Sequence, residues 1–509
     1  MRYMKLSYKF YAKMDSESSR FIHNKNTPTL TANFTKNIQI IQNEFQKNPY
    51  FMTKYTKVLD KEMALLYFQG LSDIEKVQDY ILHLTAPDQP IFFDSSSPFE
   101  LLKQIIIPAE EIKHTSYIHD IVNAILSGKT VFLFENHEQA LIVSTGNTIE
   151  RSISDPPSQN VIRGPRDGFT ESLQTNAILI FQRIKNPKLR IQQKTIGTLT
   201  NTNIEIIYIQ DLVDKTILNI LIQRIENIKL EGILESSYLE SYLLDPGYSP
   251  FPTIYHTERP DIVAAALLNG RIAILVDKTP FVLIVPSLFQ HFLQSNEDEY
   301  QSVYFSSFIR LLRYISFWTS MTLPSLFIAV TCFHQEIIPT PLLMNLSAQR
   351  SAVPFPPIIE MLLMEITFEV FREAALRLPR LVANSISIVG ALVIGEAAVQ
   401  AGVVSSATII IVAFTAMTNF IFPFYTLSFS TRLVRFVFLL CASMLGLYGV
   451  VLGIIVLLLH LCGIRSFGLE YFAPSSVQYQ KLFRRPYSKS KPVSLVGKWK
   501  SYFQNRSRV

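Results

Sequence analysis

The chain has 509 residues, of which 48% are hydrophobic and 17% are charged. Soluble proteins usually carry about 25% charged residues, and the deficit here lies mainly between Tyr314 and Gly463. These values exclude a wholly soluble enzyme, a disordered chain and a small disulfide-rich scaffold. The net charge of +6 is uneven, because residues 471–509 hold nine Lys or Arg and no Asp or Glu. Subtracting these nine charges leaves −3 for the remainder of the chain.

The first 33 residues are predicted to form a mobile basic tail. Residues 1–14 are basic and aromatic but lack the continuous apolar core of a secretory signal peptide. We therefore expect the large region that follows to lie on the cytosolic side of a membrane.

Residues 34–308 alternate between helix and strand patterns in two blocks of similar style. The first block predicts a strand at 61–68, helices at 74–84 and 118–126, and a hairpin at 130–134 and 139–143. The second predicts helices at 177–183, 218–228 and 264–268, and strands at 204–209, 271–276 and 281–285. This pattern favours two α+β subdomains, at 34–156 and 157–308, that meet near Pro156-Pro157.

No constellation of catalytic residues stands out in either subdomain. The run Gly128-Lys129-Thr130 is similar to a phosphate loop, but it follows a helix and precedes a strand, the reverse of the required order. The three cysteines lie inside apolar stretches and lack metal-ligand spacing. We therefore expect no enzyme activity, no cofactor, no bound metal and no nucleic-acid partner.

Residues 309–470 are predicted to form a helical membrane domain. Residues 314–333 are free of Asp, Glu, Lys and Arg, which is long enough to span about 30 Å of hydrocarbon, and Pro324 should bend this helix. Residues 436–463 are predicted as another span. The apolar region between them is divided into helices at 382–402 and 408–427. Residues 471–509 form a basic cytosolic tail.

The segment 356–377 differs from these apolar helices, because Glu365, Glu369 and Glu373 follow one stripe at i, i+4 spacing. Arg372 and Arg377 can pair with Glu369 and Glu373 across i+3 and i+4. Each charge exposed at the centre of a bilayer costs about 3 kcal/mol. This acidic helix should therefore lie at the membrane interface, or bury its acidic stripe against protein or water.

The helix at 382–402 has two distinct faces on a helical wheel. Small residues that permit close helix packing share one face: Ser387, Ala391, Gly395, Ala398 and Gly402. The opposite face carries Val389, Val393, Glu396 and Gln400. An ionisable residue within a membrane segment is a functional hypothesis by default.

Several copies of this helix around an axis would stack these residues as rings lining a pore. Valine rings can close a pore by dewetting, and a carboxylate ring favours cations. In the alternative interpretation, Glu396 hydrogen-bonds a neighbouring helix or lies near one membrane surface. The periodicity of the sequence leaves both interpretations open.

Four long motifs resemble the GerA-type spore germination proteins, specifically the A subunits of nutrient germinant receptors. They are VIRGPRDGFTESLQTN at 161–176, SPFPTIYHTERPD at 249–261, VPFPPIIEMLLMEITFEVFREAALRLPR at 353–380 and SIVGALVIGEAAVQAG at 387–402. The resemblance runs from about residue 34 to residue 472 in consistent order. Residues 277–280 (DKTP) and Ala375 depart from the usual pattern, which affects the expected local turn geometry.

The resemblance implies a multi-pass protein of the spore inner membrane, partnered by a transporter-like B subunit and a lipoprotein C subunit. It also implies that the A subunit self-associates, as a pentamer, into a cation channel that the nutrient opens. Carried over to this sequence, the pore-lining helix corresponds to residues 387–402, with Val389 or Val393 as the constriction and Glu396 attracting cations. A non-conducting scaffold that relays a signal within the same receptor is the competing hypothesis.

The expected topology has four spans, with 356–377 not crossing the membrane. A cytosolic amino-terminal region and a basic carboxyl-terminal tail both favour the inside, which requires an even number of crossings. Five spans are the alternative, which would export the tail.

Overall fold

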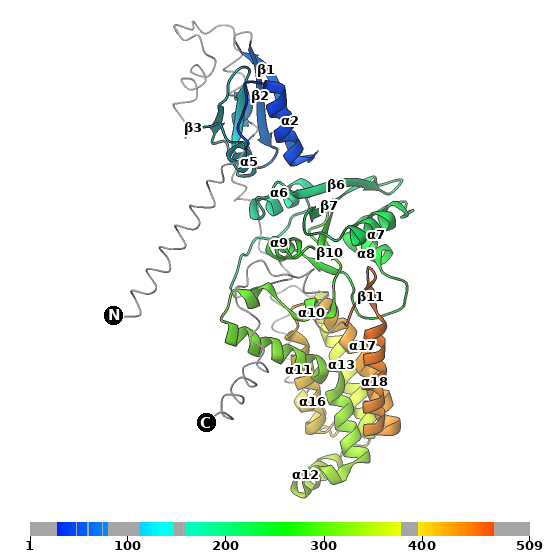
Figure 1. The fold of residues 1–509 in the computed structure, drawn as a ribbon. Helices are drawn as coiled ribbons and strands as arrows, with labels where there is room; N and C mark the ends of the chain where they lie inside the picture. Colours follow the sequence, from blue (N-terminus) through cyan, green and yellow to red (C-terminus); the bar gives the residue numbers. More distant parts are fainter. Residues whose placement is uncertain are drawn as a thin grey trace, which may run out of the picture.

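The computed structural model describes residues 28–46, 48–58, 61–73, 75–79, 112–146, 156, 159, 161, 163–377 and 395–472. It contains two α+β subdomains followed by a bundle of helices (Figure 1). Each subdomain is built on a five-stranded antiparallel sheet. The predicted fold class is therefore confirmed.

The first subdomain packs helices against a sheet with the strand order β1-β2-β4-β5-β3. Its elements are α2 (Phe34–Phe45), β1 (Phe51–Val58), β2 (Lys61–Phe68), β3 (Ile112–Thr115), α5 (Ile118–Leu126), β4 (Thr130–Phe134) and β5 (Ala140–Val143). Helix α2 begins where the Asn33 side chain accepts a hydrogen bond from the Lys36 N–H. Its apolar face, with Ile38, Ile41 and Phe45, is buried in the core.

The second subdomain has the strand order β6-β7-β9-β10-β8. Its elements are α6 (Leu173–Arg183), β6 (Leu189–Ile196), β7 (Thr202–Ile209), α7 (Lys215–Glu226), α8 (Ser236–Leu243), β8 (Tyr255–Thr257), α9 (Pro260–Leu268), β9 (Ile272–Val276) and β10 (Val282–Val285). The fully buried strands β4, β9 and β10 are continuous apolar runs, which is why the sequence predicts them closely.

The two subdomains share one topology, since each sheet places its third strand at the edge beside its fifth. Each subdomain also has the same pair of hydrogen bonds between a threonine that precedes a helix and an asparagine in the first turn of that helix. The Thr31 N–H donates to Asn37 Oδ1 (3.0 Å) and the Asn37 amide donates back to the Thr31 carbonyl (2.6 Å). Thr170 and Asn176 make the same pair of bonds, at 2.8 and 2.6 Å. The second block therefore repeats the first in structure as well as in style.

A buried carboxylate joins the two subdomains. The Tyr50 hydroxyl at the start of β1 donates to Glu205 Oε1 in β7 (2.7 Å), and the Gln193 amide donates to the same oxygen (2.9 Å). Glu205 is fully buried, and its Oε2 has no hydrogen-bond partner among the described residues. Because the negative charge is only partly compensated, burial raises the pKa of Glu205.

We expect Glu205→Gln to stabilise the fold increasingly as the pH rises. A raised pKa means that the folded state binds the proton more tightly than the unfolded state. The wild-type protein is therefore most stable while Glu205 is protonated, and it loses stability as the pH rises through the raised pKa. The amide keeps an acceptor for Tyr50 and removes the charge, which should add about 1 kcal/mol to the free energy of unfolding at mildly alkaline pH. Thermal unfolding of both proteins across pH measures this, and a pH-independent difference would contradict it.

The helical region follows the second sheet and begins with the short elements α10 (Phe289–Leu293) and η1 (Asn296–Glu299). The bundle and its connections are α11 (Val303–Ile328), η2 (Ala329–Phe333), η3 (Gln335–Ile337), α12 (Thr340–Arg350), α13 (Pro357–Arg377), α15 (Gly395–Gln400), α16 (Ser406–Phe420), α17 (Tyr425–Leu445) and α18 (Leu447–Gly463). A two-stranded ribbon, β11 (Arg465–Ser466) and β12 (Leu469–Glu470), follows α18.

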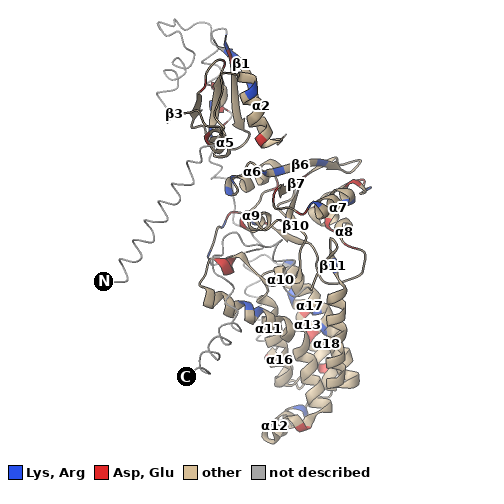
Figure 2. Cartoon of the chain, in the orientation of Figure 1, with Lys and Arg blue, Asp and Glu red and all other residues tan. Residues whose placement is uncertain are grey.

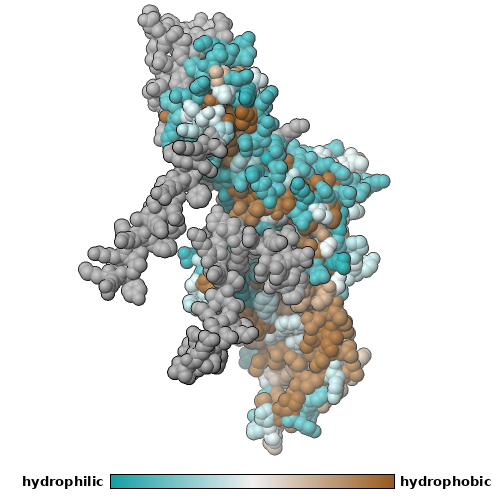
Figure 3. Space-filling view, in the orientation of Figure 1, coloured by the Kyte–Doolittle hydropathy of each residue, from teal (hydrophilic) through white to brown (hydrophobic). Residues whose placement is uncertain are grey.

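Much of the bundle surface is apolar, and the brown area in the lower half of Figure 3 shows this on one face. Large exposed side chains contribute to it, including Val437, Leu440, Val451 and Leu459. Among the described residues, two helices are long and apolar enough to cross a membrane, Val303–Phe333 and Tyr425–Leu445, while Ser406–Phe420 and Leu447–Gly463 are apolar but shorter. An exposed apolar surface of this kind fits burial in lipid.

Three predicted helices have other bounds in the structure. The predicted helix 408–427 is divided, because α16 ends at Phe420 and α17 begins at Tyr425. The first apolar helix begins at Val303 rather than Tyr314, and it contains Pro324 before ending in the π-helical turn η2. The predicted continuous helix 436–463 is divided at Gly446 into α17 and α18. Gly446 has φ of +61°, and a Cβ there would lie 2.8 Å from Cβ of Phe333. Only glycine fits this tight turn.

The bundle starts and finishes beside the second subdomain, at what we term the sheet end. Phe424, just before α17, stacks on Tyr255 with ring centroids 4.5 Å apart. After α18, the Ser466 hydroxyl donates to the Thr253 carbonyl (2.9 Å). The opposite, far end holds Gly446. Both ends of the helical region therefore lie on one side of the bundle, beside the second subdomain.

Candidate functional site

The predicted pore helix, with its pore-lining and packing faces, is only partly described by the structure. Ser387, Val389, Ala391 and Val393 lie outside the described residues. The other predicted residues lie on α15 or shortly after it.

Glu396 and Gln400 form one exposed polar pair on α15. The Gln400 amide donates to Glu396 Oε1 (3.1 Å), as expected for residues one helical turn apart. Both side chains are exposed in the single chain. No Lys or Arg of the described residues forms an ion pair with Glu396. The carboxylate is therefore oriented by its amide neighbour but keeps its negative charge available.

The small-residue face of the same helix behaves differently at its two ends. A Cβ added to Gly395 would meet nothing within 4 Å, so the single chain leaves open space there. Ala398 is half-buried. Gly402 ends the helical segment with φ of +65°, and a Cβ at this residue would lie 2.9 Å from the carbonyl oxygen of Ala352. This close approach fixes the end of α15 at the far end of the bundle, beside the chain that follows α12.

The acidic helix α13 buries part of its stripe against α17, which is the second of the two arrangements that the sequence predicts. Figure 2 shows several charged residues of the bundle where α13 lies beside α17. Arg435 Nη1 and Glu365 Oε2 are 2.6 Å apart, and both side chains are almost completely buried. The Arg435 Nε–H also donates to the Ser320 carbonyl of α11 (2.7 Å). One guanidinium thus ties three helices together.

A second ion pair lies about one turn away on α13, closer to the sheet end. Arg432 Nη1 is 2.5 Å from Glu369 Oε2, and Arg372 Nη1 is 4.0 Å from Glu369 Oε1. The Arg372 guanidinium also donates to the Ser428 hydroxyl (3.2 Å) and lies over the Tyr425 ring. The predicted i+3 pairing of Arg372 with Glu369 is confirmed.

The third glutamate of the stripe, Glu373, is exposed and pairs with Arg377 at 2.7 Å, as the i+4 spacing predicts. Glu360, one turn earlier than the predicted stripe, was missed. It is buried and accepts hydrogen bonds from the N–H (2.5 Å) and hydroxyl (2.6 Å) of Ser405 at the start of α16. No local spacing connects these two residues, since 45 positions separate them.

Two groups of acidic side chains in the bundle differ in their partners. Glu365 and Glu369 are neutralised by arginines inside the protein, whereas Glu396 stands on an exposed helix face without a cationic partner among the described residues. Breaking a buried pair is costly, because the charge that remains has no partner. An unpaired carboxylate with an amide beside it is suited to attract a mobile cation.

The profile described as Bacillus/Clostridium GerA spore germination protein matches residues 39–493. The chain belongs to this family. Spore germination protein KA of Bacillus subtilis (strain 168) is 42% identical to this GerA-family chain over 472 residues, which are 91% of this chain and 86% of that protein. The uncharacterized membrane protein YfkQ of the same bacterium is 39% identical over 414 residues, 80% of this chain and 79% of that protein.

A solved structure is also similar to this chain: the crystal structure of the N-terminal domain of the A subunit of the Bacillus megaterium spore germinant receptor GerK3. The similarity covers 52% of this chain and 98% of that chain, with 29% sequence identity and a TM-score of 0.42. Membership of the GerA family confirms the resemblance that the four motifs indicate. It makes the chain a membrane protein of spore germination, and not an enzyme.

Proposed function

We propose that this chain is the A subunit of a nutrient germinant receptor in the spore inner membrane, and that several copies form a cation channel opened by the nutrient. The observation that carries the proposal is the exposed pair of Glu396 and Gln400, which has no cationic partner among the described residues. A carboxylate left exposed on a helix of a membrane bundle needs water or other protein around it. A water-filled pore between copies supplies both.

The path of the chain supports a pore helix that crosses the whole bundle. Arg372 lies at the sheet end, beside Tyr425, while Gly402 lies at the far end, beside Ala352. We therefore propose that the segment between them crosses the bundle from one end to the other. Counting α13 and the division at Gly446, we propose six crossings rather than four, which keeps the number even.

The direction of the proposed pore helix, from the sheet end to the far end, determines the order of the residue rings along the pore. Glu396 and Gln400 lie close to Gly402 and hence near the far mouth. Val389 and Val393 precede them in the sequence, and in the proposed channel they would lie deeper, toward the sheet end. Cations would collect at the acidic mouth and meet an apolar constriction behind it, which is an arrangement suited to gating by dewetting.

The packing face completes the proposed assembly. Gly395 has open space around it in the single chain, and small residues at such positions allow close approach of a neighbouring helix. We propose that this face contacts an adjacent copy in a pentamer. The family resemblance adds a transporter-like B subunit and a lipoprotein C subunit as partners.

Spores carrying Glu396→Gln test the proposal. Removing the ring of negative charge is expected to slow nutrient-triggered release of potassium several-fold, because the mouth no longer concentrates cations. Glu373→Gln is the matched control, since Glu373 is also an exposed glutamate but pairs with Arg377 on α13. At equal protein level, release at the wild-type rate in both variants would contradict the channel.

A non-conducting scaffold is the alternative function. The two cytosolic subdomains favour it, because nearly half of the chain folds outside the bundle. Under this alternative the valine face packs into a core and Glu396→Gln has no effect on ion release. Ion flux through a bilayer that contains only the purified chain would exclude it.

A further inference from the structure

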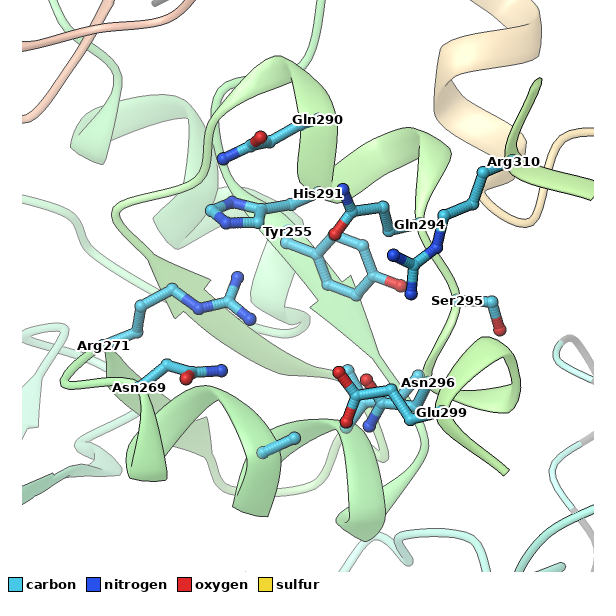
Figure 4. A pocket seen from close by; sticks show the side chains of 12 residues that line it. Tyr255, Asn269, Arg271, Gln290, His291, Gln294, Ser295, Asn296, Glu299 and Arg310 are labelled. Atoms are coloured by element: carbon cyan, nitrogen blue, oxygen red, sulfur yellow. The ribbon is translucent and has the colours of Figure 1, made fainter. Parts of the chain in front are cut away.

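A polar cavity of about 210 Å³ lies where the second subdomain meets the first long helix of the bundle (Figure 4). Its walls come from β8, the end of α9, the chain leading into β9, α10, η1 and α11. Arg271 projects into it from one side and Arg310 of α11 from the other. Sites for drug-sized ligands are larger, about 300–1,000 Å³, so this cavity fits a small molecule.

Arg271 enters this cavity without a compensating charge. Its side chain is 9% exposed, and its guanidinium makes no ion pair or hydrogen bond with any described residue. Burial lowers the pKa of Arg271 to about 10, so the side chain remains cationic at neutral pH. A buried charge that lacks a partner is destabilising by itself. The Arg271 guanidinium is therefore suited to bind an anion in this cavity.

Among the described residues that line the cavity, Arg271 is the arginine that makes no ion pair. Arg310 shares Asp298 with Arg313, since Arg310 Nε lies 3.2 Å and Arg313 Nη1 lies 2.7 Å from the same Oδ2. His291 is neutral, because burial and then the charge of Arg271 lower its pKa well below the usual value. Its Nδ1 accepts the Leu288 N–H (3.0 Å). Glu299 also lines the cavity, but it is engaged within the chain.

Three amide side chains complete the lining. Asn269, Gln290 and Gln294 are half-buried, border the cavity, and have no side-chain hydrogen bond to a described residue. Figure 4 shows Gln290 and Gln294 on the α10 side and Asn269 beside Arg271. Amides of this kind can donate to or accept from hydroxyl and carbonyl groups of a bound molecule.

We propose that this cavity binds a small monocarboxylate, with its carboxylate on the Arg271 guanidinium and its polar substituents on the three amides. A guanidinium presents parallel N–H groups that match a carboxylate. One unpaired cation matches one negative charge, which favours a carboxylate over a phosphate dianion. Because α11 supplies part of the wall, the bound molecule touches both the cytosolic sheet and the helix that enters the bundle.

The test is thermal unfolding of the full-length chain in detergent micelles with sodium lactate or sodium acetate, against sodium chloride at equal ionic strength and against inorganic phosphate. The wild-type chain is expected to show a saturable rise in unfolding temperature with lactate and acetate. Arg271→Met should abolish this rise. It should also unfold at a higher temperature than the wild type when no carboxylate is present, because the unmatched charge is gone.

Arg190→Met is the matched control. Arg190 is equally buried, but its guanidinium donates to Gln210 Oε1 (2.8 Å) and to the Pro187 (2.8 Å) and Glu44 (3.1 Å) carbonyls. This variant should unfold at a lower temperature and keep the rise with carboxylate. If Arg271→Met does not accumulate, Arg271→Lys replaces it. This variant is expected to need a lactate concentration at least tenfold higher for the same rise in unfolding temperature.

Three results would overturn the proposal. The wild-type chain could respond to neither carboxylate beyond chloride, or Arg271→Met could keep the response. Phosphate could instead raise the unfolding temperature more than lactate and acetate do, which would assign the cavity to a different anion.

Discussion

Arg435→Met is expected to destabilise the bundle by about 3–5 kcal/mol, because it leaves Glu365 as a buried carboxylate without a partner. The same change removes the hydrogen bond to the Ser320 carbonyl, so α13, α17 and α11 lose their shared contact. A loss of this size is comparable with the total stability of many domains. Little folded protein should therefore accumulate in the membrane, which immunoblotting of membrane fractions and thermal unfolding in detergent both measure.

A double variant separates the ion pair from the packing of its side chains. Glu365→Leu together with Arg435→Met removes both charges, and we expect it to recover most of the lost stability. Arg377→Met is the control for an exposed pair. Arg377 and Glu373 are 80% and 62% exposed, so this substitution should cost less than about 1 kcal/mol. A stable Arg435→Met, or a double variant as unstable as the single one, would contradict the account.

Val393→Ala is expected to make spores release potassium without any nutrient. If Val393 forms the constriction, a smaller side chain widens the ring and allows water to enter it, which removes the dewetting barrier. The change should affect the resting state more than the nutrient-triggered rate. Potassium in the medium of resting spores, measured at normal protein level, reports the leak directly.

Val399→Ala provides the matched control for this leak. Val399 lies on the same predicted helix, 382–402, but about a quarter turn away from the predicted pore face. It is half-buried on α15. Resting spores with this substitution should retain potassium as the wild type does. A leak in both variants would indicate general damage to the bundle, and no leak in either would remove Val393 as the gate.

The sequence predicts the central strands well and the edge strands poorly. Strand β4 (Thr130–Phe134) is completely buried and apolar, and its predicted bounds match the structure. Strand β1 (Phe51–Val58) was missed, because it forms an edge of its sheet and carries Lys54 and Lys57. Edge strands often carry lysine, which prevents pairing with other chains. Such a strand lacks the apolar signal on which the prediction depends.

The turn at Gly446 was missed for a related reason. It lies within a long apolar run, and a single glycine there is also compatible with a continuous membrane helix. The structure shows that the decisive factor is the contact with Phe333, more than a hundred residues earlier in the chain. Local sequence does not contain that information.

The charged residues of α13 show the same limit. Pairs at i+3 and i+4, Arg372 with Glu369 and Arg377 with Glu373, follow from helical geometry and are observed. The pair of Glu365 with Arg435 spans 70 positions and depends on how two helices dock. The sequence predicts that the stripe needs a partner in the membrane, since bare charges are costly there, but not which residue supplies it.

A density map of the assembled protein in a lipid bilayer tests the central claim most directly. The account predicts several copies around an axis, with Val389, Val393, Glu396 and Gln400 facing that axis and Gly395 against a neighbouring helix. A map that places this helix at the lipid boundary, or turns its small residues toward the axis, would contradict the proposed channel.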